Sequence, residues 1–149
     1  RVMEELLNEG KTRYIGVSNF SVKQFKKAQG YLKKAELVTN QLHANLTRQK
    51  HIHESLPYYQ ENGITLTAYS PLAHKGYTDV EGDLKEKLEK VAKAHDATVQ
   101  QIAIAWLINH ENVIAIPKAF NLDHVEANVE AAEITLSQEE IQTFYDLRD

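Results

Sequence analysis

"RYIGVSNFSVKQ", residues 13–24, contains the pattern that decides the fold: a short strand, a polar end and a capped helix. Its first five residues are rich in β-branched and aromatic side chains, which favour a strand. Ser18-Asn19 follows directly. Ser21 with Gln24 three residues later forms a capping box, the signature of a helix start. The stretch therefore predicts a strand with polar side chains at its carboxyl end and a helix immediately after it.

The same unit recurs along the chain. Strands are predicted at 13–17, 35–42, 64–70 and 112–117, and helices within 21–30, 51–63, 84–91 and 98–106 and after Asn121 and Ser137. Strands this short and apolar, alternating with helices, imply a parallel sheet covered by helices. There is no linker or low-complexity tract, so residues 1–149 are predicted to form a single unit.

An opening helix ending at Gly10 precedes the first strand. Nothing before Val2 could cap this helix, so we expect Arg1 to be an internal residue of a longer chain.

Two parallel architectures compete, the open doubly wound sheet and the (β/α)8 TIM barrel. None of the six glycines makes the G-x-G-x-x-G motif of a doubly wound dinucleotide-binding domain. A barrel instead carries its functional residues where each strand ends. Here the four strand ends read Ser18-Asn19, Asn40-Gln41, Tyr69-Ser70 and Lys118. Polar groups at all four ends favour the α/β barrel.

The overall composition is that of an ordinary globular domain. The 149 residues are 42% hydrophobic and 26% charged, with a formal net charge of -4. Mild acidity argues against a nucleic-acid or membrane-surface partner. Without cysteine, no disulfide, zinc-cysteine site or thiol nucleophile can form. No apolar run approaches the roughly 18 residues of a membrane span, and we expect a cytoplasmic protein.

Four motifs together resemble the aldo-keto reductase family. They are "YIGVSNF" (14–20), "TNQL" (39–42), "AYSPL" (68–72) and "IPK" (116–118), in family order and spacing. The resemblance covers the whole chain but only the C-terminal half of that fold, strands five to eight of the barrel. It implies four βα units plus a C-terminal helix.

The resemblance also implies an extended nicotinamide cofactor, usually NADPH. Ser18, Asn19 and Gln41 would bind the carboxamide, whose two donors and one acceptor need side chains of this kind. Tyr69 would stack on the nicotinamide ring. The rest of the implied cofactor set is Ser70 and Leu72 along the pyrophosphate, and Lys118, Ala119, Phe120, His124 and Asn128 around the adenosine phosphate. A lysine beside the helix start at Asn121 suits a phosphate.

Several positions depart from the family pattern. Ala119 replaces a usual serine, Ala127 a frequent glutamate, and His124 an arginine that binds the 2′-phosphate. A histidine is mostly neutral at pH 7, so NADH is the alternative cofactor. The segment "QLHANL" (41–46) is also unusual, with His43 in place of an acidic residue.

No catalytic residue is predicted in this chain. The family's tyrosine proton donor and its aspartate, lysine and histidine helpers all come from the first half of the barrel. The resemblance thus implies the cofactor half of an enzyme that reduces small carbonyl compounds, aldehydes or ketones. The alternatives are a non-catalytic nicotinamide-binding or regulatory protein and an inactive half-barrel fragment.

A half-barrel leaves two unpaired sheet edges and an uncovered interior. We therefore expect it to pair with the missing N-terminal half or with a second copy of itself. A metal site is not predicted, because His51 and His53 of "HIHE" (51–54) point to different faces of a helix.

Overall fold

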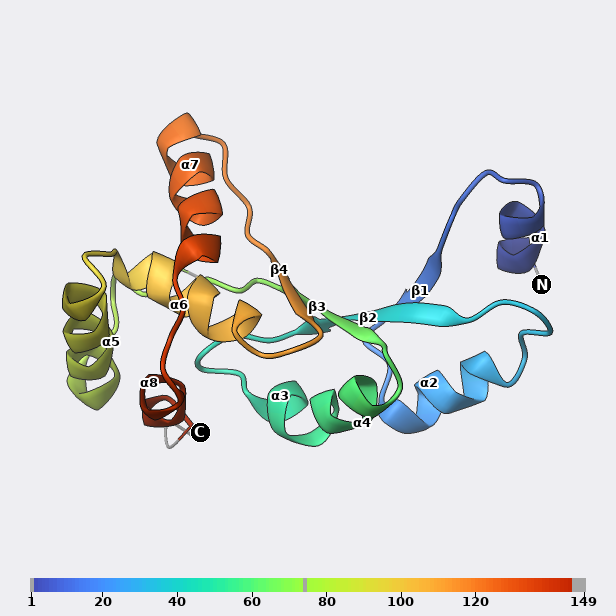
Figure 1. Cartoon of the computed structure of the whole chain (residues 1–149), viewed down its shortest axis with the longest axis horizontal. Helices are drawn as coiled ribbons and strands as arrows, with labels where there is room; N and C mark the ends of the chain where they lie inside the picture. The colour runs from blue at the N-terminus through green and yellow to red at the C-terminus, as the bar shows by residue number, and fades with distance from the viewer. Residues whose placement is uncertain (1, 74, 146–149) are drawn as a thin grey trace.

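A four-stranded parallel sheet forms the centre of the molecule. The computed structural model describes residues 2–73 and 75–145. Its strands are β1 (Ile15–Ser18), β2 (Leu37–His43), β3 (Thr65–Tyr69) and β4 (Val113–Ile116), in the order β1-β2-β3-β4 (Figure 1). All three pairings are parallel. The four predicted strands are confirmed, with ends displaced by no more than two residues.

Helices separate the strands in the predicted alternation. They are α1 (Val2–Asn8), α2 (Val22–Gln29), α3 (Lys50–Glu54), α4 (Leu56–Glu61), α5 (Gly82–Ala94), α6 (Val99–Ile108), α7 (Leu122–Glu130), the 3-10 helix η1 (Ala131–Glu133) and α8 (Gln138–Thr143). The capping boxes at Ser21, Thr98 and Ser137 are all present. Asn121 caps α7 by accepting a hydrogen bond from the Asp123 backbone N–H at 2.9 Å. These helix starts are set by local sequence, as predicted.

One helix prediction is wrong. The segment 51–63, predicted as a single helix, divides into α3 and α4 at Ser55. Pro57 is the physical reason, since proline has no N–H to bond the carbonyl four residues earlier and its ring clashes with that carbonyl. Proline is tolerated in the first turn of a helix, where α4 places it.

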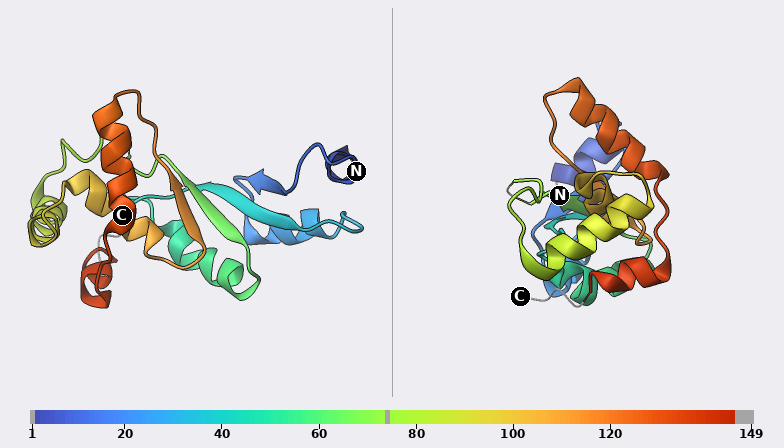
Figure 2. Two further views of the ribbon diagram at one scale, coloured as in Figure 1. Left: turned by 45° about the horizontal axis from the view of Figure 1, so that its top comes forward. Right: turned by 90° about the vertical axis from the view of Figure 1, so that its left-hand side faces the viewer.

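The two faces of the sheet differ. Leu42, Leu66 and Ala68 point toward the helices and are fully buried. Helices α2, α3 and α4 lie along this side of the strands (Figures 1 and 2). On the opposite face, Ile114 and Ile116 of β4 are 50% and 43% exposed. The expectation that these strands are too apolar to face solvent therefore holds on one face only.

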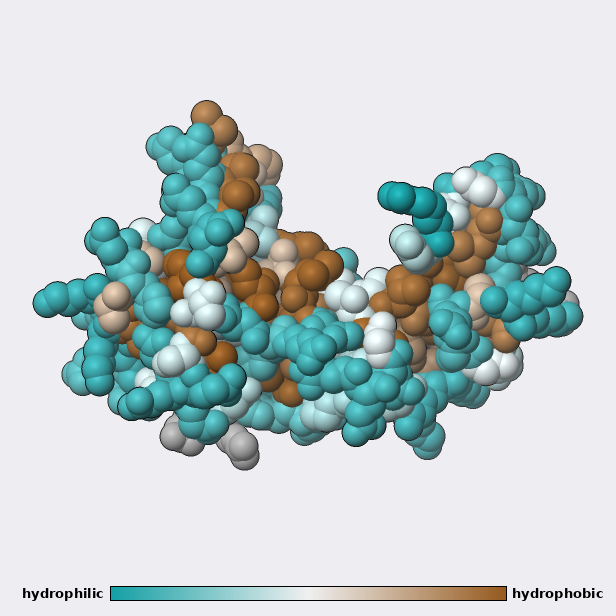
Figure 3. Space-filling view, viewed as in Figure 1, coloured by the Kyte–Doolittle hydropathy of each residue, from teal (hydrophilic) through white to brown (hydrophobic). Residues whose placement is uncertain are grey.

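The uncovered face is hollowed and partly apolar. Figure 3 shows hydrophobic atoms on the floor of the hollow and along one side of α7. The exposed apolar residues of α7 are Leu122, Val125 and Val129. Their i, i+3, i+7 spacing gives the helix one apolar stripe. We call this surface, made of Ile114, Ile116 and the α7 stripe, the open face.

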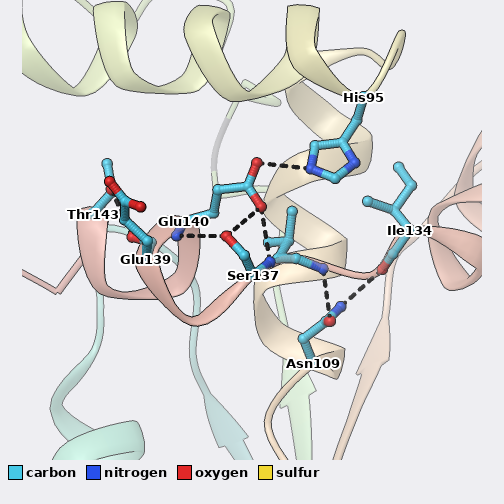
Figure 4. Close-up of polar contacts among 8 residues, drawn as sticks. His95, Asn109, Ile134, Ser137, Glu139, Glu140 and Thr143 are labelled. Carbon is cyan, nitrogen blue, oxygen red and sulfur yellow. Dashed lines mark hydrogen bonds and ion pairs between the residues drawn. The ribbon is translucent and has the colours of Figure 1, made fainter.

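The C-terminal segment is held in place by polar contacts, most of them partly buried. Asn109, at the end of α6, donates to the Ile134 carbonyl at 2.9 Å and accepts from the Leu136 N–H at 3.0 Å (Figure 4). The Glu140 carboxylate accepts from the Ser137 N–H at 2.8 Å and contacts His95 Nε2 at 2.9 Å (Figure 4). Hydrogen bonds from Ser137 hold the pKa of Glu140 below its ordinary value. Helix α8 is thereby held against α5 and α6.

Gly16 is required where β1 meets β2. It faces Thr39 in the sheet register, and a Cβ at Gly16 would lie 2.5 Å from Thr39 Cγ2 and 2.7 Å from the Thr39 carbonyl oxygen. The second of these atoms is backbone and cannot move without displacing the strand. Glycine at this position therefore allows the two strands to approach.

We predict that Gly16→Ala lowers the free energy of unfolding by about 1–3 kcal/mol, because overpacking forces β1 away from β2. Urea denaturation of both proteins measures the change. Gly30→Ala is the matched control, since Gly30 has φ of -64° and its added Cβ would meet only ordinary contacts near 3.5 Å. Equal stability for the two variants would contradict the close approach of β1 and β2.

Candidate functional site

Strand register brings polar side chains together at one edge of the sheet. Ser18 pairs with Gln41, Gln41 with Thr67, and His43 with Tyr69. All five residues lie opposite the helix-facing side, because they alternate with buried residues such as Leu42 and Ala68. Three of the residues predicted to bind the nicotinamide, Ser18, Gln41 and Tyr69, thus share one face at the carboxyl ends of adjacent strands.

Asn19 completes this group. Tyr69 Oη donates a hydrogen bond to Asn19 Oδ1 at 3.1 Å, which joins residues 50 positions apart. The Asn19 N–H also donates to the Gln41 carbonyl at 2.9 Å, and Ser18 Oγ donates to the same oxygen at 3.0 Å. We call the group Ser18, Asn19, Gln41 and Tyr69 the rim cluster.

Two residues at the strand ends have left-handed backbones. Asn19, after β1, has φ of 58°, and Ser70, after β3, has φ of 51°. Such angles are uncommon outside glycine and asparagine, and they concentrate at functional sites. Ser70 is exposed, whereas Leu72, two residues on, packs against the hydrophobic core. Of these two predicted pyrophosphate residues, Ser70 is exposed and Leu72 is partly buried.

Asn40 differs in role from its neighbour Gln41. Its side chain points to the helix side and is fully buried, where Nδ2 donates to the Phe20 carbonyl and to Tyr59 Oη, both at 2.7 Å. The Phe20 N–H donates back to Asn40 Oδ1 at 3.4 Å. Asn40 therefore fixes the turn that carries Asn19, instead of facing the rim cluster.

His43 is a member of the site that the sequence analysis did not select. Its ring stacks on the Tyr69 ring with centroids 4.9 Å apart and an interplanar angle of 23°. The signal was available in the period-two alternation of β2, which places His43 on the same face as Gln41. The sequence instead predicts a strand that ends at Leu42, with His43 in the unusual segment 41–46.

A second group follows β4. Lys118 Nζ lies 4.5 Å from the centroid of the Phe120 ring, and Phe120 is 90% exposed. His124 is exposed on α7, while Ala119 and Asn128 are partly buried. Within the described residues, no recorded hydrogen bond or ring contact joins this group to the rim cluster. The predicted set thus divides into two groups at the carboxyl edge.

Other kinds of site have less support. Across residues 2–73 and 75–145, no group of three or more His, Asp or Glu side chains is arranged to hold a metal ion. Among the same residues, no helix combines the length and apolar character needed to cross a membrane.

Comparison with known proteins identifies the family. The sequence model of the Aldo/keto reductase family matches residues 1–149, and the chain belongs to this family. The predicted half of an aldo-keto reductase barrel is confirmed by its structural relatives. A thermostable aldo-keto reductase, solved with the inhibitor epalrestat, superposes with a TM-score of 0.89 at 39% identity, over 97% of this chain and 52% of the other. An aldo/keto reductase from Klebsiella pneumoniae, solved with NADP and acetate, superposes with a TM-score of 0.85 at 34% identity, over 97% of this chain and 51% of the other.

Curated relatives show the same coverage. Methylglyoxal reductase YeaE of Escherichia coli is 34% identical over 140 residues, which are 93% of this chain and 49% of the relative. Glyoxal reductase of Bacillus subtilis is 34% identical over 145 residues, 95% of this chain and 48% of the relative. The chain therefore spans about half the length of the curated relatives it matches.

We predict that Asn40→Ala costs about 1–3 kcal/mol of stability, because the Phe20 backbone and Tyr59 hydroxyl lose a buried partner. Tyr59→Phe removes only one of these bonds and is the matched comparison, with a smaller loss expected. Thermal unfolding of both variants measures the difference. The reverse order of stabilities would show that the Asn40–Phe20 contact does not hold the turn.

Proposed function

We propose that this chain is the cofactor-binding half of a reductase that uses NADPH to reduce small aldehydes or ketones. The observation that carries the proposal is the hydrogen bond between Tyr69 and Asn19, which assembles an amide and an aromatic ring on the open side of the sheet. When bound, NADPH would supply a hydride to the carbonyl carbon of the substrate.

The rim cluster has the chemistry to hold a nicotinamide. Asn19 Oδ1 already accepts from Tyr69, so the Asn19 amide N–H₂ has donors to offer a carboxamide oxygen. Gln41, with a donor and an acceptor, lies beside Ser18 in the same register. The Tyr69 ring is half-buried, with a flat apolar surface suited to stacking on another ring. These residues would orient the nicotinamide.

The residues after β4 suit the adenosine phosphate. Lys118 is an exposed cation three residues before the Asn121 cap of α7. The first backbone N–H groups of a helix and a neighbouring positive charge both favour an anion. His124, on the first turns of α7, could add charge only when protonated. NADPH is therefore proposed as the cofactor, and NADH stays the alternative.

The proton donor is proposed to lie outside these 149 residues. Of the seven tyrosines, Tyr69 is assigned to stacking, and burial raises the pKa of Tyr59, Tyr77 and Tyr145. A raised pKa is opposite to what a tyrosine needs in order to exchange a proton near neutral pH. The substrate class, a small carbonyl compound, is supported by relatives named as methylglyoxal and glyoxal reductases.

The open face is proposed to be covered by the other four βα units of the same protein. The relatives are about twice as long as the region matched, which is the length that four further units need. The strands β1 and β4 each pair on one side only in the described sheet. Such edges and the exposed α7 stripe are what a complementary half-barrel would bury. A cytoplasmic location, expected from the sequence, stays a prediction.

We predict that residues 1–149, produced alone, associate in solution and reduce no aldehyde, because the open face is uncovered and the proton donor is absent. Analytical ultracentrifugation and NADPH consumption with methylglyoxal measure the two properties. Adding the remaining polypeptide of the complete protein should restore reduction. A monomer that unfolds cooperatively would contradict the covering of the open face, and turnover by residues 1–149 would contradict the assignment of the proton donor.

We predict that Lys118→Ala in the complete protein weakens NADPH binding roughly tenfold or more, since a charge-assisted phosphate contact is lost. The loss should shrink at high salt. Quenching or enhancement of NADPH fluorescence measures the affinity. Lys93→Ala, an exposed lysine on α5, is the matched control and should leave the affinity unchanged. Equal affinities for the two variants would show that Lys118 does not contact the phosphate of NADPH.

A further inference from the structure

His43 and Tyr69 form an aromatic pair that ends two neighbouring strands. Each is the last residue of its strand, and the two are partners in the parallel register. Their rings stack at 4.9 Å with 23° between the planes. Because His43 covers one face of the Tyr69 ring, the opposite face is the one left for a stacked ligand. Tyr69 is further fixed in its own plane by the bond to Asn19.

A buried amide sets the protonation of His43. Asn45 Oδ1 lies 3.0 Å from the Thr47 N–H, which can only donate, so the oxygen of this amide is identified. Asn45 Nδ2 is consequently the donor, to the Ser70 carbonyl at 3.0 Å and to His43 Nε2 at 3.4 Å. An imidazole nitrogen that accepts a hydrogen bond carries no proton. His43 is therefore held as the neutral tautomer with its proton on Nδ1.

We infer that His43 is a positioning residue for nicotinamide binding, acting through Tyr69. As a neutral imidazole it supports the back of the Tyr69 ring, and Asn45 joins this support to Ser70, the residue after β3. The inference rests on the proposed function, because it specifies how the nicotinamide end of that same site is organised. It adds a residue from β2 that holds the stacking ring at a defined angle.

The arrangement makes cofactor binding sensitive to acid. Burial, with a smaller contribution from the positive charge of Arg48, lowers the pKa of His43 from its ordinary 6.5. The titratable groups around His43 are Tyr69 on β3, Arg48 in the following loop and His51 on α3. Protonation of His43 would place an N–H on Nε2 opposite the Asn45 amide N–H₂. Two donors would then face each other, and the hydrogen bond between Asn45 and His43 would break. The support is therefore intact above pH 6.5 and is lost as the pH falls through the lowered pKa.

Three variants of the complete protein test this role. His43→Ala removes the ring and should weaken NADPH binding three- to tenfold at neutral pH. His43→Phe keeps a ring in the stack and should bind nearly as well as the unaltered protein at neutral pH, without the additional loss in acid. His110→Ala is the matched control, because burial also lowers the pKa of His110 while its ring contacts the Trp106 carbonyl and the Tyr145 hydroxyl. It should leave both the affinity and the pH profile unchanged.

The measurement is the NADPH dissociation constant from nicotinamide fluorescence, determined for each protein between neutral and mildly acidic pH. Protonation of the cofactor phosphate affects every variant equally, so only differences between proteins count. If the unaltered protein binds and His43→Ala binds equally well, the inference is overturned while the proposed function stands. An acid-induced loss as large in His43→Phe as in the unaltered protein also overturns it. If the unaltered protein does not bind NADPH, both proposals fail.

Discussion

The in-register pairing of the four parallel strands is the constraint on which the site depends. Leu42 and Ala68 are buried under the helices, so Gln41, His43 and Tyr69 must lie on the opposite face. Since side chains alternate along a strand, a slip of one residue would exchange the two sets. Burial of the apolar set under the helices thus fixes the polar set as well. Core packing and site assembly are two results of one register.

Local contacts then determine how β1 joins this sheet. Gly16 lets the strand approach Thr39, and the buried Asn40 amide bonds the Phe20 backbone one residue after Asn19. Both contacts hold the end of β1, from which the Asn19 side chain reaches Tyr69. A buried amide is well suited to this purpose, because leaving any of its partners unpaired costs free energy. The geometry of the rim cluster is therefore supported by Gly16 and Asn40, which lie outside the cluster.

The open face carries polar side chains suited to binding a ligand and exposed apolar side chains that favour association with another protein surface. Polar side chains gather at its carboxyl edge, while the exposed isoleucines of β4 and the apolar stripe of α7 lie beside them. Apolar area left in water forgoes roughly 25 cal/mol of stabilisation for each Å². A surface of this kind favours a complementary structure over it. Such a cover would also lie over the strands that carry the rim cluster.

The sequence by itself determined the strand–helix alternation, the capped starts of the helices and the polar strand ends, because these depend on neighbours within a few residues. It also indicated the family, through four spaced motifs. Only the tertiary structure decided that Asn40 is buried while Gln41 faces the rim, and that His43 stacks on Tyr69. Both depend on which strands pair and which face the helices cover, and contacts between residues far apart in the chain set both.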